Sequence, residues 1–220
     1  MTLQEKVALV TRPRKRAPLA GGGADGNERL TAATGAVLLL LFVVQIVTIL
    51  QINKLLTLHF FIGMLLLGPV TLKVVSACYR MVRYYVGAAD YRKKGPPATA
   101  MRILGPFVLV TSLSVLGSGV VLAFTGPKAG PWLMLHKATF VLWATVMAVH
   151  VLVYVRRLPR LIGPDMRVRV GPDPTREVLA GRPQRWLLLA GSIAFGLIIA
   201  VLTLRLAAPW VAWLSLPGPH

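Results

Sequence analysis

Five stretches of the chain are almost continuously apolar, and polar segments separate them. Each is long enough to cross a hydrocarbon core about 30 Å thick, which takes roughly 20 helical residues. Backbone amides that face lipid are satisfied within a helix, and the stretches are too long for barrel strands. The pattern therefore predicts an all-α integral membrane helical bundle with five transmembrane helices, at about 31–52, 55–79, 102–124, 132–155 and 186–206.

The polar segments predict how the rest of the chain is organised. Residues 1–30 are rich in Gly, Pro and basic residues and hold too few apolar residues to form a core, so they are predicted to be disordered. Short turns near Asn53 and at 125–131 join four stretches into two antiparallel hairpins. The predicted divisions are a disordered basic cytoplasmic tail at 1–30, a four-helix transmembrane core at 31–155, a cytoplasmic connection at 156–185, a fifth transmembrane helix at 186–206 and a short outer tail at 207–220.

Composition and charge support the membrane class and add an orientation. The chain is 55% hydrophobic with a mean hydropathy of +0.67, which exceeds what a soluble domain carries. Its net charge of +18 gathers in the tail and in two of the connections, all on one side of the predicted bundle. The positive-inside rule then predicts a multi-pass protein of the cell (inner or plasma) membrane with a cytoplasmic N-terminus and an outer C-terminus.

The same charge does not indicate a nucleic-acid partner. No aromatic residues interleave with the basic ones in a recognisable nucleic-acid-binding module. We interpret the excess of basic residues mainly as a signal that orients the protein in the membrane, and secondarily as a source of attraction to anionic membrane lipid. Membrane lipid is therefore the expected surrounding, and the oligomeric state stays open.

Histidines within the predicted helices are the candidate chemistry, because an ionisable residue in a membrane span is expensive and suggests a function. His59 and His136 each lie about five residues into helices that run in the same direction, so they should lie at similar depth near the outer face. His150 follows His136 by fourteen positions, which returns to within about 40° of the same helix face, about 21 Å further along. The same step from His59 leads to Lys73, so an inner level pairs Lys73 with His150.

Two imidazoles that face each other across a bundle can supply the two axial nitrogens of haem iron. Gly63 follows His59 by one turn on the same face, where a missing side chain lets a flat ring approach the backbone. The predicted cofactor-binding residues are therefore His59, His136 and Gly63, with His59 and His136 as the metal ligands. Lys73 and His150 are further candidates at the inner level.

This arrangement of histidines resembles the membrane b-type cytochromes: the haem-carrying membrane subunits of formate dehydrogenases and hydrogenases, and the transmembrane ferric reductases. The resemblance covers roughly residues 31–155 and implies haem b as the cofactor. Those families typically carry two haems, whereas here the inner pair has Lys73, whose amine binds iron only when deprotonated. We therefore expect one haem at His59 and His136. Lys73 could instead face a haem propionate, bind a quinone or extend toward the headgroups.

The expected function is a b-type cytochrome membrane subunit that transfers electrons between haem and the quinone pool or a partner oxidoreductase. The cytoplasmic connections at 90–97 and 161–183 have no GxGxxG after a strand, no Walker-type loop and no CxxC pair. The sequence also shows no constellation of a catalytic acid and base, so it is not expected to be a self-contained enzyme. The alternative is a haem-free membrane scaffold or accessory subunit, or a small transporter with Lys73 and His150 in a proton path. The transporter version is weaker because no Asp or Glu lies in a predicted helix.

Overall fold

The computed structural model describes residues 22–96, 99–128, 130–155, 159–160, 162–163 and 181–216, and within these ranges it contains helices and turns but no strand. Five helical runs are long and apolar enough to cross a membrane. The predicted all-α bundle with five spans is therefore confirmed. The helices are α2 (Gly23–Leu50), α3 (Ile52–Tyr85), α4 (Ala89–Lys94), α5 (Thr99–Thr125), α6 (Gly130–Tyr154), α8 (Arg182–Thr203), the 3₁₀ turn η3 (Leu204–Ala207) and α9 (Ala208–Leu214).

The first span begins earlier than its apolar pattern indicates. Residues 23–30, expected to belong to a disordered tail, form the first two turns of α2. Asn27 is buried there, and its Nδ2 donates to the carbonyl of Ser76 on α3 at 3.0 Å. Tertiary contacts thus stabilise a segment whose composition favours disorder. The expected disorder of residues 1–21 and the connection at 164–180 lie outside the described residues.

The fifth span also runs further than expected, because α8 continues through η3 into α9. The segment at 207–220, expected to be a short tail, therefore contains a helix. Trp210 of α9 is only 8% exposed, and its Nε1 donates to the Leu122 carbonyl of α5 at 3.2 Å. This contact holds α9 against the end of the bundle.

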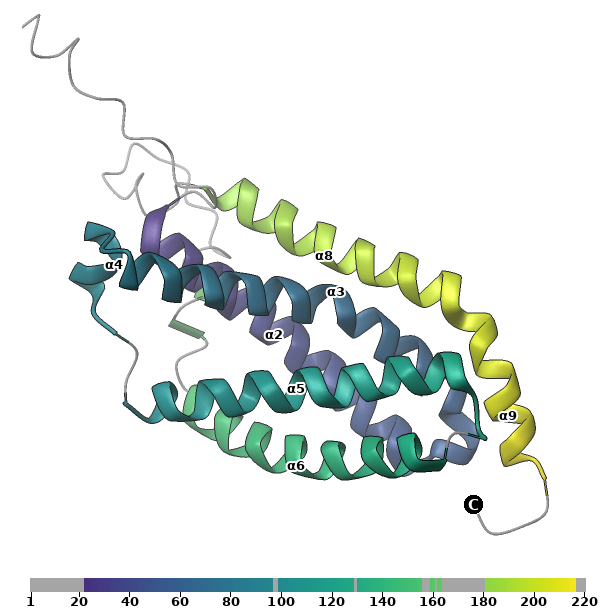
Figure 1. The fold of residues 1–220 in the computed structure, drawn as a ribbon. Helices are drawn as coiled ribbons and strands as arrows, with labels where there is room; N and C mark the ends of the chain where they lie inside the picture. Colours follow the sequence, from purple (N-terminus) through teal and green to yellow (C-terminus); the bar gives the residue numbers. More distant parts are fainter. Residues whose placement is uncertain are drawn as a thin grey trace, which may run out of the picture.

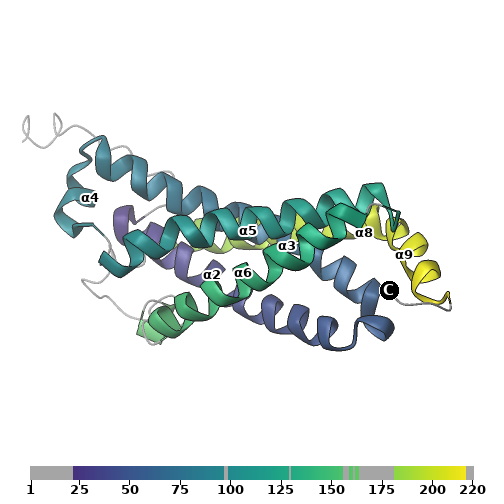
Figure 2. The ribbon, with the colours of Figure 1, turned by 60° about the horizontal axis from the view of Figure 1, so that its bottom comes forward.

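Two antiparallel hairpins, α2–α3 and α5–α6, and the long helix α8 build the bundle (Figures 1 and 2). Backbones approach closely between α2 and α3, between α3 and α8, and between α5 and α6, whereas the α5–α6 hairpin meets the other spans at few points. The short helices α4 and α9 lie at opposite ends of the bundle (Figure 1), which we call the α4 end and the α9 end. The space between the hairpins is thus filled by side chains rather than by close backbone contact.

The closest helix crossing lies between α3 and α8. A Cβ atom on Gly68 would lie 2.0 Å from the carbonyl oxygen of Ser192, and one on Gly196 would lie 2.1 Å from that of Leu65. Small residues at such a crossing let two membrane helices pack backbone against backbone. This crossing fixes α8 on the side of α3 away from the α5–α6 hairpin (Figure 1).

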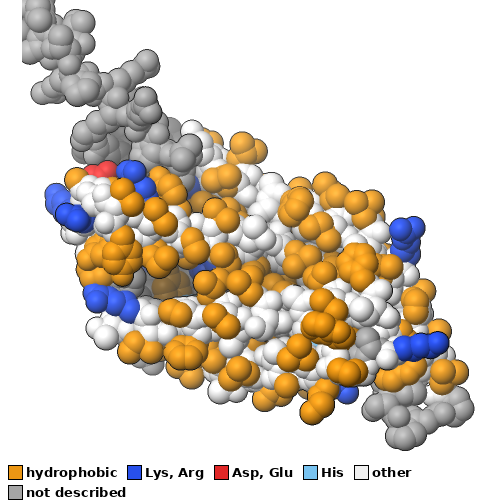
Figure 3. Space-filling model, viewed as in Figure 1, with side chains coloured by type: hydrophobic (Ala, Val, Ile, Leu, Met, Phe, Trp, Pro, Cys, Tyr) orange, Lys and Arg blue, Asp and Glu red, His pale blue; other side chains and the backbone are white. Residues whose placement is uncertain are grey.

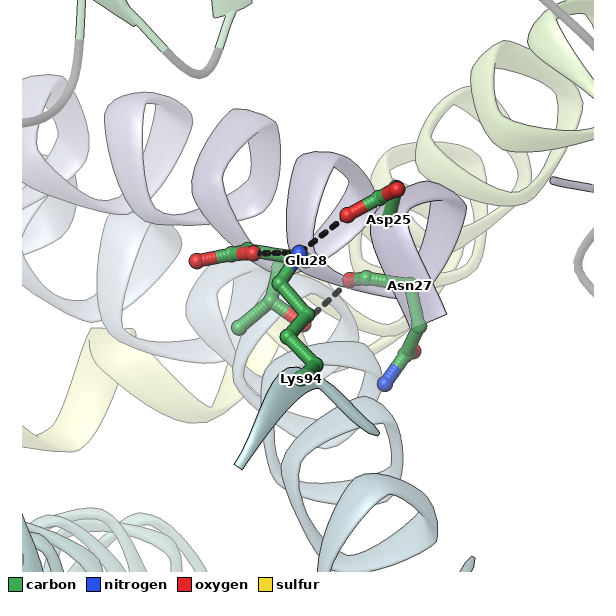
Figure 4. A network of polar contacts seen from close by, with 5 residues as sticks. Asp25, Asn27, Glu28 and Lys94 are labelled. Carbon is green, nitrogen blue, oxygen red and sulfur yellow. Dashed lines mark hydrogen bonds and ion pairs between the residues drawn. The ribbon is translucent and has the colours of Figure 1, made fainter. Parts of the chain in front are cut away.

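Helix α4 is fastened to the start of α2 by ion pairs. Figure 4 shows Lys94 Nζ between the carboxylates of Asp25 and Glu28. Tyr91 of α4 is only 5% exposed and lies edge to face with Tyr79 of α3, with ring centroids 6.2 Å apart. Burial, followed by the neighbouring phenol of Tyr79, raises the pKa of Tyr91. The connection between the second and third spans therefore folds back onto the bundle.

The surface of the molecule suits contact with membrane lipid. Apolar side chains cover the face in Figure 3 along the length of the bundle, while Lys and Arg gather toward the two ends. Leu40, Leu50, Met134, Leu152 and Leu202 are among the exposed apolar residues. Together with the five spans, this surface fits a multi-pass membrane protein.

Candidate functional site

A cavity of about 390 Å³ lies among α2, α3, α5, α6 and α9. His59 from α3 and His136 from α6 both line it, and so does Gly63. The volume falls in the range of about 300–1,000 Å³ that is typical of sites for small molecules and cofactors. The two histidines that were paired by their depth along separate hairpins thus belong to one cavity.

His59 is oriented by the end of α2. Thr48 Oγ1 lies 2.9 Å from Nδ1 of His59, and the same hydroxyl donates its hydrogen to the Gln45 carbonyl at 2.6 Å. With that hydrogen committed to the carbonyl, the Thr48 oxygen accepts from Nδ1–H. The neutral imidazole then carries its lone pair on Nε2, the nitrogen available to a metal.

Gln45 covers that nitrogen. Its Nε2 donates to the His59 carbonyl at 3.1 Å and lies 3.4 Å from Nε2 of the His59 ring. Because the His59 carbonyl accepts a hydrogen bond, the Gln45 amide group must turn its nitrogen toward it. The second N–H of that nitrogen can then reach the lone pair on Nε2 of His59. Gln45 Oε1 is buried without a hydrogen-bond partner. A ligand on Nε2 of His59 therefore requires the Gln45 side chain to rotate away.

His136 repeats this arrangement on the other hairpin. Ser118 Oγ of α5 lies 3.0 Å from Nδ1 of His136 and donates to the Val115 carbonyl at 3.1 Å. By the same reasoning, Nδ1 carries the hydrogen and Nε2 the lone pair. A Cβ atom on Gly119 would lie 3.1 Å from Cε1 of the ring, so the glycine lets the imidazole lie close to α5.

Aromatic side chains form a fixed wall of the cavity. Trp143 is 6% exposed, and its Nε1 donates to Ser112 Oγ of α5 at 3.0 Å. Its ring lies edge to face with Phe42 at 4.7 Å and tilted against Phe140 at 6.1 Å. The tryptophan ring is thus held by packing and by a hydrogen bond, which makes the wall rigid and apolar.

Lys73 and His150 form a separate cluster. Lys73 Nζ donates to the Thr31 carbonyl at 2.6 Å and lies 5.7 Å from the centroid of the Tyr154 ring. His150 stacks on the same ring at 5.9 Å with an interplanar angle of 7°. Neither residue lines the cavity of His59 and His136. The spacing paired Lys73 with His150, and the structure places both beside Tyr154.

Across the described part of the chain, no three His, Cys, Asp or Glu side chains come together to hold a metal ion by themselves. A metal at His59 and His136 therefore needs further ligands, which the four nitrogens of a porphyrin supply. The residues present fit such a group: two imidazoles with Nε2 as the free nitrogen, a glycine at Gly63 and apolar walls. Gln45 is the group in the way.

The sequence pattern did not single out Gln45, Thr48 or Ser118 beforehand. All three are polar residues on the hairpin partner of a histidine. A usable signal exists: Gln45 and His59, like Ser118 and His136, lie at similar distances on either side of a hairpin turn. Polar residues in such register are predicted to meet across an antiparallel pair.

Comparison of the chain with protein-family models, with curated proteins and with solved structures gives no match. The resemblance to membrane b-type cytochromes therefore depends on the placement of the histidines alone.

Proposed function

We propose that this protein is a b-type cytochrome membrane subunit that holds haem b between Nε2 of His59 and Nε2 of His136. The observation that carries the proposal is the matched environment of the two imidazoles on one cavity. Each Nδ1 lies beside a hydroxyl, Thr48 at 2.9 Å and Ser118 at 3.0 Å, on the partner helix of its hairpin. Hydrogen bonds to the second ring nitrogen commonly orient histidines that bind metals.

Bound haem supplies one-electron chemistry, which the chain's own residues would support in three ways. Gly63 would leave room for a flat ring near α3 once Gln45 rotates away, and Gly119 lets the His136 imidazole lie close to α5. Trp143 and Trp210, each held by a hydrogen bond to α5, supply apolar walls of the cavity. The low dielectric of these surroundings and two neutral imidazoles set the potential. With haem bound, the protein would carry single electrons between a quinone or partner redox protein and that group, without substrate chemistry of its own.

The orientation in the membrane belongs to the same proposal. With the basic α4 end in the cytoplasm, the haem cavity lies in the outer half of the cell membrane and α9 covers it from outside. Arg80, Arg83, Arg92, Lys93 and Lys94 at the α4 end support this orientation. Electrons from a partner on the outer face then have the shorter path to His59 and His136.

The test is the dithionite-reduced minus oxidised absorption spectrum of the detergent-purified protein, with a pyridine haemochrome count. We expect a sharp b-type α-band and about one haem per chain, both lost in His59→Ala and in His136→Ala. His150→Ala is the matched control, because His150 lies outside the cavity and its loss should leave the band in place.

Two other outcomes decide between the alternatives. A count near two that falls to one in His150→Ala returns a second haem to the inner level. A colourless protein from cells well supplied with haem, with both His59 and His136 tolerant of alanine, overturns the proposal and leaves the haem-free scaffold.

A further inference from the structure

Lys73 is a cation inside the bundle, and no carboxylate in the described part of the chain forms an ion pair with it. The seven acidic residues of the chain lie at positions 5, 25, 28, 90, 165, 173 and 177, and none is within the apolar part of a span. Asp25 and Glu28 are already engaged by Lys94 at the α4 end. A charge held within membrane helices is costly and usually marks a path or site for a ligand or ion.

The structure holds this ammonium inward. Lys73 Nζ donates to the Thr31 carbonyl at 2.6 Å, which uses one of its three N–H groups. A Cβ atom on Gly35 would lie 2.9 Å from Nζ, so the glycine makes the space that the ammonium fills. Lys73 therefore points into the space between α2 and α6 instead of extending to the headgroups.

His150 adds a second polar atom at the same place. Its Nδ1 is buried and has no hydrogen-bond partner. Its ring is stacked on Tyr154, over whose face Lys73 also lies, so two nitrogens that can donate flank one phenol. Buried donors of this kind are normally paired, and leaving one unpaired costs about 1–3 kcal/mol.

The surface over this half of the molecule is open toward the membrane. Figure 3 shows it hollowed between α3 and α5, toward the α4 end, where the two hairpins diverge in Figure 1. Apolar side chains lie along the hollow, and Lys and Arg side chains lie beside it toward the α4 end (Figure 3). An amphiphile dissolved in the lipid can therefore approach from the side, with its polar head toward the basic end.

We propose that Lys73 and His150 form a second binding site, for the electron-rich oxygen of a membrane-soluble amphiphile. The remaining N–H groups of the Lys73 ammonium and an imidazole N–H of His150 supply donors, and phosphate or carbonyl oxygen supplies the acceptor. Two molecules share this chemistry, an anionic phospholipid and a quinone. The site is separate from the His59 and His136 cavity, so it does not depend on haem binding.

The experiment is equilibrium binding to the delipidated full-length protein in detergent, with three probes: phosphatidylglycerol, phosphatidylcholine and a decyl-substituted benzoquinone. We expect one acceptor probe to bind the wild-type protein about tenfold or more tightly than it binds Lys73→Met. The matched control is Lys54→Met, the same change at an exposed lysine near the α9 end, which should bind like the wild type. Preference for phosphatidylglycerol over phosphatidylcholine identifies a headgroup with a net negative charge, and preference for the quinone identifies a carbonyl.

A second variant guards against a folding defect in Lys73→Met. Gly35→Ala keeps the charge but places a methyl group in the space that Nζ fills, so it should weaken the same probe in the same direction. His150→Phe keeps the stacking on Tyr154, removes the donor and should also weaken binding. Equal binding of every probe to wild type, Lys73→Met and Gly35→Ala overturns the proposal, whatever the absorption spectrum shows about haem.

Discussion

At the scale of single residues, the hydroxyls of Thr48 and Ser118 have the same role on the two hairpins. Each passes its hydrogen to a backbone carbonyl and accepts from the Nδ1 of a histidine. The hydroxyl of a serine or threonine in a membrane helix usually donates a hydrogen bond to a backbone carbonyl of the same helix, as that of Thr34 does to the Leu30 carbonyl at 2.8 Å. Thr48 and Ser118 do so and also present an oxygen to a ring on the neighbouring helix.

Removing these oxygens should loosen haem without removing its ligands. In Thr48→Val and Ser118→Ala, Nδ1 loses its acceptor, so the imidazole can change tautomer or rotate, and we expect haem affinity to fall about 10- to 100-fold. The measurement is haem transfer to apomyoglobin, together with the midpoint potential, which should shift in both variants. A b-type spectrum should remain at saturating haem.

Thr34→Val is the matched control for this prediction. Thr34 is fully buried and its hydroxyl bonds only within α2. Its loss should leave haem transfer and potential unchanged. If all three variants lose haem alike, the effect is one of general packing, and if none does, the hydroxyls have no part in orienting the ligands.

The sequence predicts the histidines of this cavity better than it predicts their partners. Counting residues from the start of each helix predicts depth, and this paired His59 with His136, which both line one cavity in the structure. The rotation of α2 about its own axis relative to α3 depends on side-chain packing between the two helices. Counting residues along the chain does not predict this rotation. Gln45 and Thr48 face His59 because of that rotation, so they emerge only from the structure.

At the scale of elements, the crossing of α3 and α8 depends on two glycines. Gly68→Ala would place a methyl carbon 2.0 Å from a backbone oxygen, and Gly196→Ala would place one at 2.1 Å, both far inside van der Waals contact. The backbone cannot move aside as a flexible side chain can. The helices must separate, so we expect each variant to lose about 1–3 kcal/mol of stability or more. Thermal unfolding in detergent, followed by circular dichroism, measures the fall in Tm.

Gly191→Ala on α8 is the comparison for this crossing. A Cβ atom there meets nothing within 4 Å. Alanine favours helix over glycine by about 0.5–1 kcal/mol, so Tm should stay or rise slightly. A Gly196→Ala protein as stable as Gly191→Ala would show that α8 does not pack on α3 at this point.

The sequence predicts which segments are spans but not where helices end. Apolar length identified five spans because the membrane sets that length. The start of α2 depends on Asn27 reaching Ser76, and α9 depends on Trp210 reaching Leu122. Both contacts join residues far apart in the chain, and so neither end is visible in the local pattern.

At the scale of the whole molecule, a bundle that crosses a membrane has its α4 end on one side and its α9 end on the other. The cavity of His59 and His136 and the cluster of Lys73 and His150 then lie in different halves of the bilayer. Along one helix their levels are about 21 Å apart. Orientation therefore decides which of the two sites lies nearer to which compartment.

Cysteine labelling on intact cells tests this orientation. Cys78 is the single cysteine of the chain, so Cys78→Ser gives a background into which Lys54→Cys, Lys128→Cys or Lys93→Cys is introduced at exposed positions. Because the basic α4 end should stay in the cytoplasm, we expect a membrane-impermeant maleimide to label the first two and to label the third only after permeabilisation. The opposite pattern would place the His59 and His136 cavity in the cytoplasmic half and would make a partner on that side the nearer electron donor.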